Sequence, residues 1–292
     1  MSEYLLEIKN LKKSFPLNTG KSSLFGKKSR MCAVDNMSLS IKKGETYGLV
    51  GESGCGKSTT GRAIVGLTKP DSGSILYDGK DLCKLSDKEF KPLRKELQMV
   101  FQNTLSALNP RQRIGDILED ILKIHSNLDA AERREKVVEV LKKVGLSEDH
   151  YFRFPHELSG GQVQRLGIAS ALVIGPKLIV CDEPVSALDV SIQAQILNML
   201  MQLQKELGLS LLFISHDIGV IRFISDRIGV MYLGTLVEET DTEELFANPL
   251  HPYTKGLFAS VPDPYIERDG FSELSGEQPV RTEDFKGCAF ST

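Results

Sequence analysis

The chain has 292 residues, of which 41% are hydrophobic, enough for one large domain or two smaller ones with a substantial core. Its formal net charge of −3 gives no indication of nucleic-acid binding. No apolar run is long enough to span a bilayer, and residues 1–10 lack the pattern of a secretory signal. The five cysteines are scattered without metal-ligand spacing, so free thiols in a reducing compartment are expected. We therefore expect a cytosolic protein, for which a partner would supply any membrane spans.

The N-terminal part predicts an antiparallel β layer. Residues 5–12 and 33–41 alternate apolar and polar side chains, as half-buried strands do, and Lys43-Gly44 is a turn signal. Between the two strands lies a basic, glycine-containing loop at residues 20–30. This loop is either a solvated surface segment or a contact with a membrane surface.

A glycine-rich motif follows the next apolar strand, Thr46 to Val50. It reads Gly51-Glu52-Ser53-Gly54-Cys55-Gly56-Lys57-Ser58, and a helix is expected from Thr59 to Val65. Two glycines that enclose four residues before Lys-Ser have the P-loop spacing, in which backbone N–H groups and the helix N-terminus hold phosphates. Lys57 would reach the β- and γ-phosphates, and the Ser58 hydroxyl would bind Mg²⁺. The alternative is a glycine-rich turn before an ordinary helix.

The middle of the chain combines a short strand with a helical region. After a hairpin signal at Asp78-Gly79, residues 97–101 form an apolar strand that ends at Gln102. The position leaves two roles open for Gln102. In the first, its side-chain carbonyl oxygen binds Mg²⁺ or holds the attacking water. In the second, its side chain makes hydrogen bonds to the loop backbone. Residues 114–144 have apolar side chains at helical spacing and end at a C-cap glycine, Gly145.

A second glycine motif opens a helix near residue 160. It reads Leu158-Ser159-Gly160-Gly161-Gln162. Ser159 is a good N-cap, and the two glycines expose backbone N–H groups at a helix start, which is a possible second anion site. Without the first motif, a capped helix start would be the preferred interpretation.

The strand from Lys177 ends in two carboxylates, Asp182 and Glu183, the Walker B arrangement. Adjacent carboxylates at the end of an apolar strand are costly unless they are paired or bind a metal. Asp182 would hold Mg²⁺ through its water shell, and Glu183 could polarise a water as general base.

Two further polar turns follow. Asp189 precedes a helix expected from Val190 to Leu207, where it could be a simple N-terminal acid. His216 follows the strand at 210–214 and could contact a γ-phosphate or position water, although Asp217 capping the next helix is the simpler interpretation. Residues 228–232 and 235–239 predict a closing hairpin, and a proline-rich boundary at 251–264 precedes a polar tail.

Taken together and in this order, the motifs resemble the ATP-binding cassette family of transporter ATPases. The resemblance implies an α/β fold, a P-loop NTPase (RecA-like) core with an antiparallel β subdomain, a helical signature subdomain at about 106–175 and a short C-terminal extension. The ATPase domain would cover residues 1–248 and the extension 249–292. ATP would lie between the P-loop of one subunit and the Leu158–Gln162 signature of another.

The same resemblance implies roles for the remaining site residues. Phe15 would stack on adenine. His216 would sense the γ-phosphate, and Gln102 would link Mg²⁺ to a membrane partner. Thr59 and Asp189 would complete the nucleotide contacts.

A narrower resemblance points to the peptide/nickel importer subfamily. Three segments show this resemblance: residues 186–195, the Leu108-Asn109-Pro110 turn and His251-Pro252-Tyr253-Thr254. In addition, the basic loop at 24–28 is similar to that of the second ATPase of oligopeptide and dipeptide permeases. It implies a peripheral subunit on the cytoplasmic face of the membrane that pairs with a homologous ATPase, or with itself in isolation. Two transmembrane permease subunits and an extracytoplasmic binding protein would complete the importer, without nucleic acid.

The chain departs from that subfamily at three places. Val163 and Ser170 stand where relatives often have arginine, and the tail has one cysteine, Cys288, where an iron–sulfur cluster typically needs four. We expect that the chain is truncated there or that this feature is missing. Nickel or glutathione as cargo, a non-transport ATPase of the same fold and a P-loop kinase or GTPase remain as alternatives.

Overall fold

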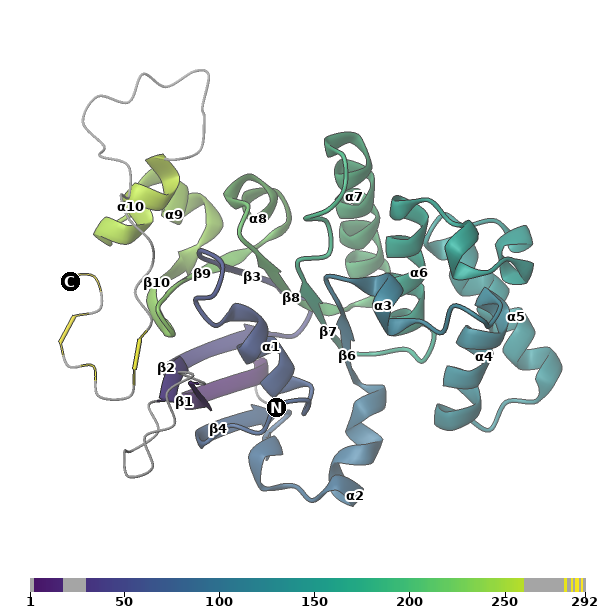
Figure 1. Ribbon diagram of the computed structural model, residues 1–292, viewed down its shortest axis with the longest axis horizontal. Coiled ribbons are helices and arrows are strands. Elements are labelled where there is room, and N and C mark those ends of the chain that lie inside the picture. The colour runs from purple at the N-terminus through teal and green to yellow at the C-terminus, as the bar shows by residue number, and fades with distance from the viewer. Residues whose placement is uncertain are drawn as a thin grey trace. The chain divides into compact units, whose positions relative to one another are not determined.

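The computed structural model describes residues 3–17, 30–259 and, near the C-terminus, 281, 282, 285, 287, 288 and 290. The chain forms two compact units. Figure 1 labels most of the helices and strands that they contain. The first unit comprises Met1–Lys42, Thr46–Leu85 and Ile214–Thr292, and the second comprises Lys43–Glu45 and Ser86–Phe213. Most of the basic loop at 20–30 and of the tail beyond 259 lies outside the described residues.

An antiparallel sheet in the first unit has the strand order β2-β1-β4-β5. Its strands are β1 (Tyr4–Pro16), β2 (Arg30–Lys42), β4 (Ser72–Tyr77) and β5 (Lys80–Asp81). The apolar residues of the alternating pattern, such as Leu6 and Ile8, are buried, which confirms the predicted antiparallel layer. Strand β1 is longer than expected because its last residues, Phe15 and Pro16, pair with the start of β2.

A second set of strands in the first unit carries the glycine-rich motif. Strand β3 (Thr46–Val50) pairs in parallel with β9 (Arg227–Tyr232), and β10 (Thr235–Asp241) pairs with β9 as the predicted antiparallel hairpin. All five residues of β3 are buried, as in a strand covered on both faces. The helices of this unit are η1 (Leu82–Lys84), α1 (Lys57–Ile64), α8 (Ile218–Ile224), α9 (Thr242–Ala247) and α10 (Pro252–Ala259).

The second unit combines parallel strands with helices. Strands β6 (Leu97–Val100) and β7 (Leu178–Asp182) pair in parallel. Its longer helices are α4 (Ile114–His125), α5 (Ala130–Lys143), α6 (Gly160–Leu172) and α7 (Val190–Leu207). Its short helices are α2 (Asp87–Phe90), α3 (Thr104–Ala107), η2 (Lys91–Lys95), η3 (Glu148–Phe152) and η4 (Pro155–Glu157).

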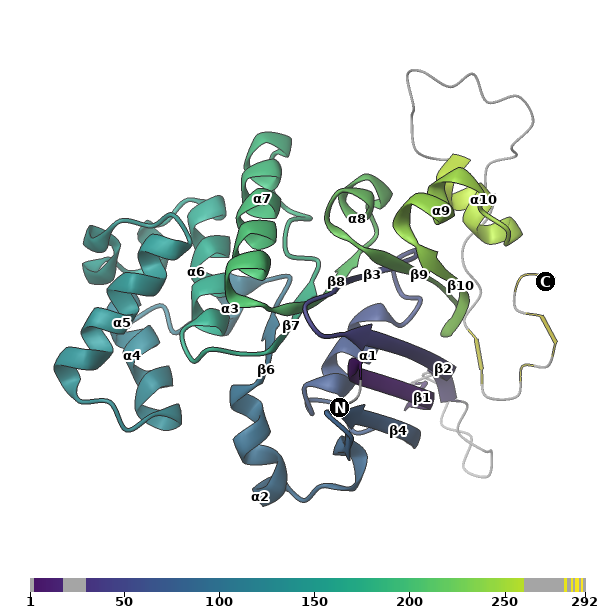
Figure 2. The same ribbon diagram turned by 180° about the vertical axis from the view of Figure 1, so that it is seen from behind.

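Helices α4, α5 and α6 pack together, as both Figure 1 and Figure 2 show. The apolar residues that predicted these helices form their core: Leu118 and Leu122 from α4 and Val137 and Leu141 from α5 are buried. Helix α5 begins at an Asp129 capping box and is followed by Gly145, whose φ of 74° is the left-handed conformation expected beyond a helix end.

Strand β8 (Ser210–Ser215) leads from the second unit back into the first. Within the described part of the chain, none of the helices has the length and apolarity to cross a membrane.

Candidate active site

The loop from Gly51 to Gly56 has the backbone that the P-loop spacing predicts. Gly51, Gly54 and Gly56 have φ values of 155°, 85° and 108°. A Cβ atom on Gly51 would collide with the carbonyl oxygen of Met231, and one on Gly56 with that of Ala33. Glycine is therefore required at both positions by close backbone approach as well as by conformation.

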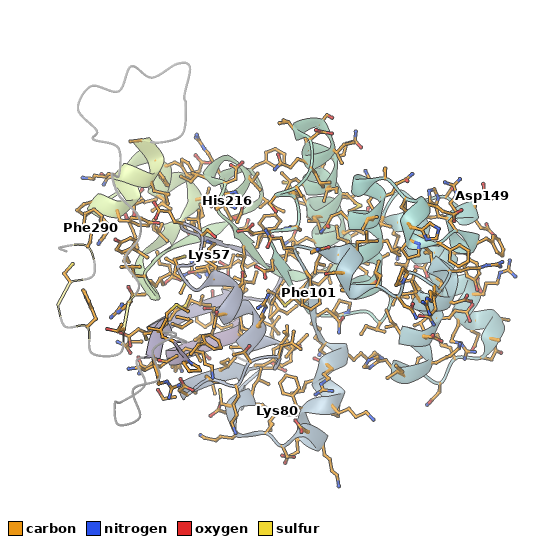
Figure 3. All side chains as sticks on the ribbon, in the orientation of Figure 1. Lys57, Lys80, Phe101, Asp149, His216 and Phe290 are labelled. Atoms are coloured by element: carbon orange, nitrogen blue, oxygen red, sulfur yellow. The ribbon has the colours of Figure 1, made fainter. Side chains whose placement is uncertain are left out.

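Lys57 is the first residue of α1 and is labelled in Figure 3. Its side chain is buried, with 4% exposed, and its Nζ donates to the carbonyl oxygens of Gly51 at 2.6 Å and Glu52 at 2.8 Å. The first turn of α1 contains no acidic residue. A buried ammonium held by neutral carbonyls, at a helix N-terminus, is an environment that favours an anion.

Cys55 lies in the same loop and is buried beside Lys57. Its Sγ is 3.7 Å from the Lys57 Nζ. Burial raises the pKa of the Cys55 thiol, although the nearby ammonium opposes this shift. The thiol is therefore protonated at neutral pH and leaves the loop without a further negative charge.

Phe15, the predicted adenine contact, lies near the end of β1 in the first unit. Its ring centroid is 5.3 Å from the Lys13 Nζ. The neighbouring backbone is fixed by Asp71, whose carboxylate accepts from the N–H of Ser14 at 2.7 Å and from Lys13 and Arg30 at 3.2 Å. Partial burial would raise the pKa of Asp71, but these donors lower it below its usual value.

His216, also labelled in Figure 3, is exposed between β8 and α8. The next residue, Asp217, is the N-cap of α8, and its Oδ1 accepts from the N–H of Val220 at 3.1 Å. The capping role considered for Asp217 is therefore confirmed. The His216 side chain next to it is exposed.

The two carboxylates of the second unit differ in environment. Asp182 ends β7 and is 3% exposed, whereas Glu183 is more exposed and has a φ of 47°. A positive φ is unusual for a residue other than glycine, and it often marks a functional position.

Gln102 makes a contact that the sequence did not predict. Its Nε2 donates to the Oε2 of Glu183 at 2.8 Å. One of the two roles left open for Gln102 was a hydrogen bond to the loop backbone. The bond observed here is of a different kind, because its partner is a side-chain carboxylate 81 residues away. The one available signal was that both residues follow strands, β6 and β7, whose ends meet in a parallel pair.

The signature motif forms a capping box at the start of α6. The Ser159 Oγ accepts from the N–H of Gln162 at 3.4 Å, and the Gln162 Oε1 accepts from the N–H of Ser159 at 3.0 Å. A Cβ atom on Gly160 would meet only Leu188, at 3.6 Å, whereas one on Gly161 would lie 2.6 Å from Ile192. Gly160 is thus an open backbone surface, and Gly161 is a packing contact with α7.

Asp189 is the N-cap residue of α7, but its side chain makes no capping hydrogen bond and is exposed. The predicted site residues thus divide between the units. Phe15, His216 and the residues from Gly51 to Thr59, including Ser53, lie in the first. The second contains Gln102, Ser159 to Gln162, Asp182, Glu183 and Asp189.

Comparison with known proteins adds to this geometry. The family model described as "ABC transporter" matches residues 34–186. The chain is also 51% identical, over 99% of its length and 89% of the relative's, to the oligopeptide transport ATP-binding protein OppF of Haemophilus influenzae. The chain belongs to the ABC transporter family.

Other known proteins and a second family model extend this similarity. AppF of Bacillus subtilis, an oligopeptide transport ATP-binding protein, is 50% identical over 99% of this chain and 89% of its own length. A second family model, "Oligopeptide/dipeptide transporter, C-terminal region", matches residues 237–292. The dimeric structure of the bacterial ABC transporter cassette MJ0796 has a TM-score of 0.71 at 30% identity and covers 81% of this chain and 98% of that one. The predicted family and the α/β P-loop fold class are confirmed.

Proposed function

We propose that this chain is the ATP-binding and ATP-hydrolysing subunit of an importer for oligopeptides or dipeptides. The observation that carries the proposal is the buried Lys57 within its glycine loop, in a chain that is about half identical, over nearly its full length, to oligopeptide transport ATP-binding proteins. The cassette domain is assigned to residues 1–248, and residues 249–292 form the C-terminal extension.

ATP binds with its phosphates in the Gly51–Ser58 loop. Lys57 exchanges carbonyl contacts for β- and γ-phosphate oxygens, and the N-terminus of α1 adds its partial positive charge. Phe15 supports the adenine ring, and His216 contacts the γ-phosphate.

Mg²⁺ is the metal that fits these residues. Among the described residues no group of three or more His, Cys, Asp or Glu could hold a metal ion. Mg²⁺ needs few protein ligands when phosphates supply the others. Ser58, Asp182 and Gln102 would hold it, and when bound it would neutralise charge on the phosphates.

Glu183 acts on the attacking water as general base. The hydrogen bond from the Gln102 amide and the positive φ of Glu183 both restrict where the carboxylate points. Gln102 therefore orients the base as well as contributing to the metal site. A perturbation that moves Gln102 would move the Glu183 carboxylate with it.

The signature helix completes the nucleotide site of a second ATPase subunit. The open surface at Gly160 leaves the first N–H groups of α6 accessible to an anion, and Asp189 lies at the start of α7, the helix that Gly161 packs against. The dimeric state of the similar cassette MJ0796 supports a paired arrangement. The second subunit is a homologous ATPase, or a second copy of this chain when it is isolated.

A permease segment docks in a cavity of about 440 Å³ in the second unit. The cavity is lined by Phe101 and Thr104, which flank Gln102 and Asn103 in sequence, and by Ile117, Ile121 and Ala171 from α4 and α6. Phe101 is labelled in Figure 3. Two permease subunits would hold the chain at the cytoplasmic face of the membrane, and an extracytoplasmic binding protein would deliver the peptide.

The proposal is tested by reconstituting this chain with its second ATPase and permease subunits in vesicles that carry the binding protein. We expect ATP-dependent uptake of a labelled tripeptide and no uptake when this chain carries Glu183→Gln. Uptake of nickel or glutathione in place of the peptide would redirect the cargo assignment. ATP hydrolysis without any transport would contradict the importer role.

A further inference from the structure

The start of helix α10 makes direct contact with the phosphate-binding loop within the first unit. The backbone N–H of Glu52 donates to the hydroxyl of Tyr253 at 3.1 Å. Tyr253 is fully buried, although it lies about 200 residues further along the chain. We propose that Tyr253 is a positioning residue that holds this loop in its nucleotide-binding shape; the inference rests on the ATP-binding function proposed above.

The route from Tyr253 to Lys57 is a single peptide group. The N–H of Glu52 and the carbonyl of Gly51 belong to the same planar trans peptide, so they point in opposite directions. The N–H is bound by Tyr253, and the carbonyl accepts from the Lys57 Nζ at 2.6 Å. Fixing one end of this peptide therefore fixes the direction of the other, and with it the position of the lysine ammonium.

The rest of the loop is held by backbone contacts that the substitution of one side chain cannot remove. Gly51 and Gly56 press against the carbonyl oxygens of Met231 and Ala33, and the Cys55 carbonyl accepts from the N–H of Gly234 at 2.9 Å. Tyr253 is different because it bonds the loop through a side chain. A change at its hydroxyl would alter one anchor and leave the others in place.

Tyr253 is itself held in place by the residues that begin α10. Its own N–H donates to the Nδ1 of His251 at 3.1 Å, and the Glu238 carboxylate accepts from the N–H groups of Leu250 at 2.7 Å and His251 at 3.0 Å. The ring of Tyr232 lies 4.3 Å from that of Tyr253. These contacts give the segment His251–Tyr253 a role: it presents a hydroxyl to the loop from a fixed direction.

The hydroxyl is suited to this role in its neutral form. Burial raises the pKa of Tyr253, with the hydrogen bond from Glu52 acting in the opposite direction. The phenol is therefore neutral throughout the physiological range and remains a hydrogen-bond acceptor for the Glu52 N–H. Loss of the hydroxyl would remove this hydrogen bond to the Glu52 N–H, and the loop would populate other conformations.

The test compares the full-length wild type with Tyr253→Phe, which removes the hydroxyl and keeps the ring. Tyr232→Phe is the matched control, because it removes a hydroxyl from the adjacent ring but not the bond to Glu52. We expect the Kd for ATP and the KM to rise about five- to tenfold in Tyr253→Phe, with kcat within about twofold, because bound ATP restores the loop. Hydrogen exchange should accelerate in the peptide that contains Glu52.

Unchanged ATP affinity and unchanged exchange of the loop would overturn the inference, as would equal effects in Tyr232→Phe. A lower melting temperature without a change in KM would assign Tyr253 a structural role only. If the phenylalanine variant does not fold, Glu238→Ala, which loosens the start of α10 while keeping the phenol, should raise Kd in the same direction; an unchanged Kd would count against the inference. Failure of the wild type to bind ATP would refute the proposed function instead.

Discussion

Alanine substitutions at Gly160 and Gly161 should have different effects. Gly160→Ala should impair activity with little change in stability, whereas Gly161→Ala should lower stability. The two glycines are adjacent at the start of α6, but their surroundings differ. A Cβ atom at Gly160 would lie 3.6 Å from Leu188, which is ordinary contact, and one at Gly161 would lie 2.6 Å from the Ile192 side chain. Both substitutions remove the backbone freedom of a helical glycine.

The magnitudes follow from these distances. Replacing glycine by alanine within a helix stabilises it by up to about 1 kcal/mol, and less at the first position. Overpacking by one methyl group costs about 1–3 kcal/mol, so the net loss at Gly161 is about 0–3 kcal/mol. Gly160→Ala should leave the free energy of unfolding unchanged or slightly higher.

The ATPase activity of Gly160→Ala should fall, although its stability should not. The methyl group of Gly160→Ala lies on the surface proposed to face the nucleotide of the second subunit, where it obstructs the approach of a phosphate to the helix N-terminus. We expect steady-state ATPase activity to fall by about tenfold or more, since lost donors at a developing charge have large effects. Urea denaturation and ATPase assays of the full-length variants measure both quantities. A stable Gly160→Ala protein with wild-type ATPase activity would refute the proposed role of this surface.

Three other substitutions test separate parts of the site. Glu183→Gln should retain ATP affinity, abolish turnover and accumulate an ATP-bound dimer on size-exclusion chromatography; unchanged hydrolysis would remove Glu183 from its role. Lys57→Ala should weaken ATP binding by at least about tenfold in an equilibrium titration, because it removes a charged phosphate contact; equal affinity would contradict the loop assignment. Asp71→Ala should lower the free energy of unfolding at pH 7 by about 1 kcal/mol, because the Ser14 N–H loses its acceptor. The pKa of Asp71 is lower in the folded protein than in the unfolded chain, where it is about 3.9. The carboxylate therefore stabilises the fold fully at pH values above the unfolded pKa, and this contribution is lost as the pH falls through the folded pKa. The difference between variant and wild type in urea denaturation should therefore shrink in acid, and a difference independent of pH would contradict this explanation.

Local signals predicted many of the elements well. The bounds of β3, Thr46–Val50, and of α7, Val190–Leu207, coincide with the expected ranges. Both have strong end signals: β3 is followed by a glycine loop, and α7 ends at Gly208, which has a left-handed φ of 63°. Strand β1 is longer than expected because Phe15 and Pro16 pair with the start of β2. The sequence of β1 alone could not predict this extension, because strand pairing depends on both segments.

Contacts between distant segments could not be predicted in the same way. The bond between Gln102 and Glu183 joins residues 81 apart, and the one between Glu52 and Tyr253 joins residues 201 apart. Neither has a periodic or compositional signal. The positive φ of Glu183 could not be predicted from the residue type either, because the surrounding structure imposes strain of this kind.

A mixing experiment tests most directly whether two subunits share each nucleotide site. One variant is Lys57→Ala, and the other is Gly160→Glu, whose negative charge suits a helix N-terminus but repels phosphate. Each variant alone should be inactive. Mixed in equal amounts, they should recover about a quarter of wild-type ATPase activity, because half of the dimers contain one intact site built from both chains. A mixture as inactive as its components, or full activity of Gly160→Glu by itself, would contradict a site shared between subunits.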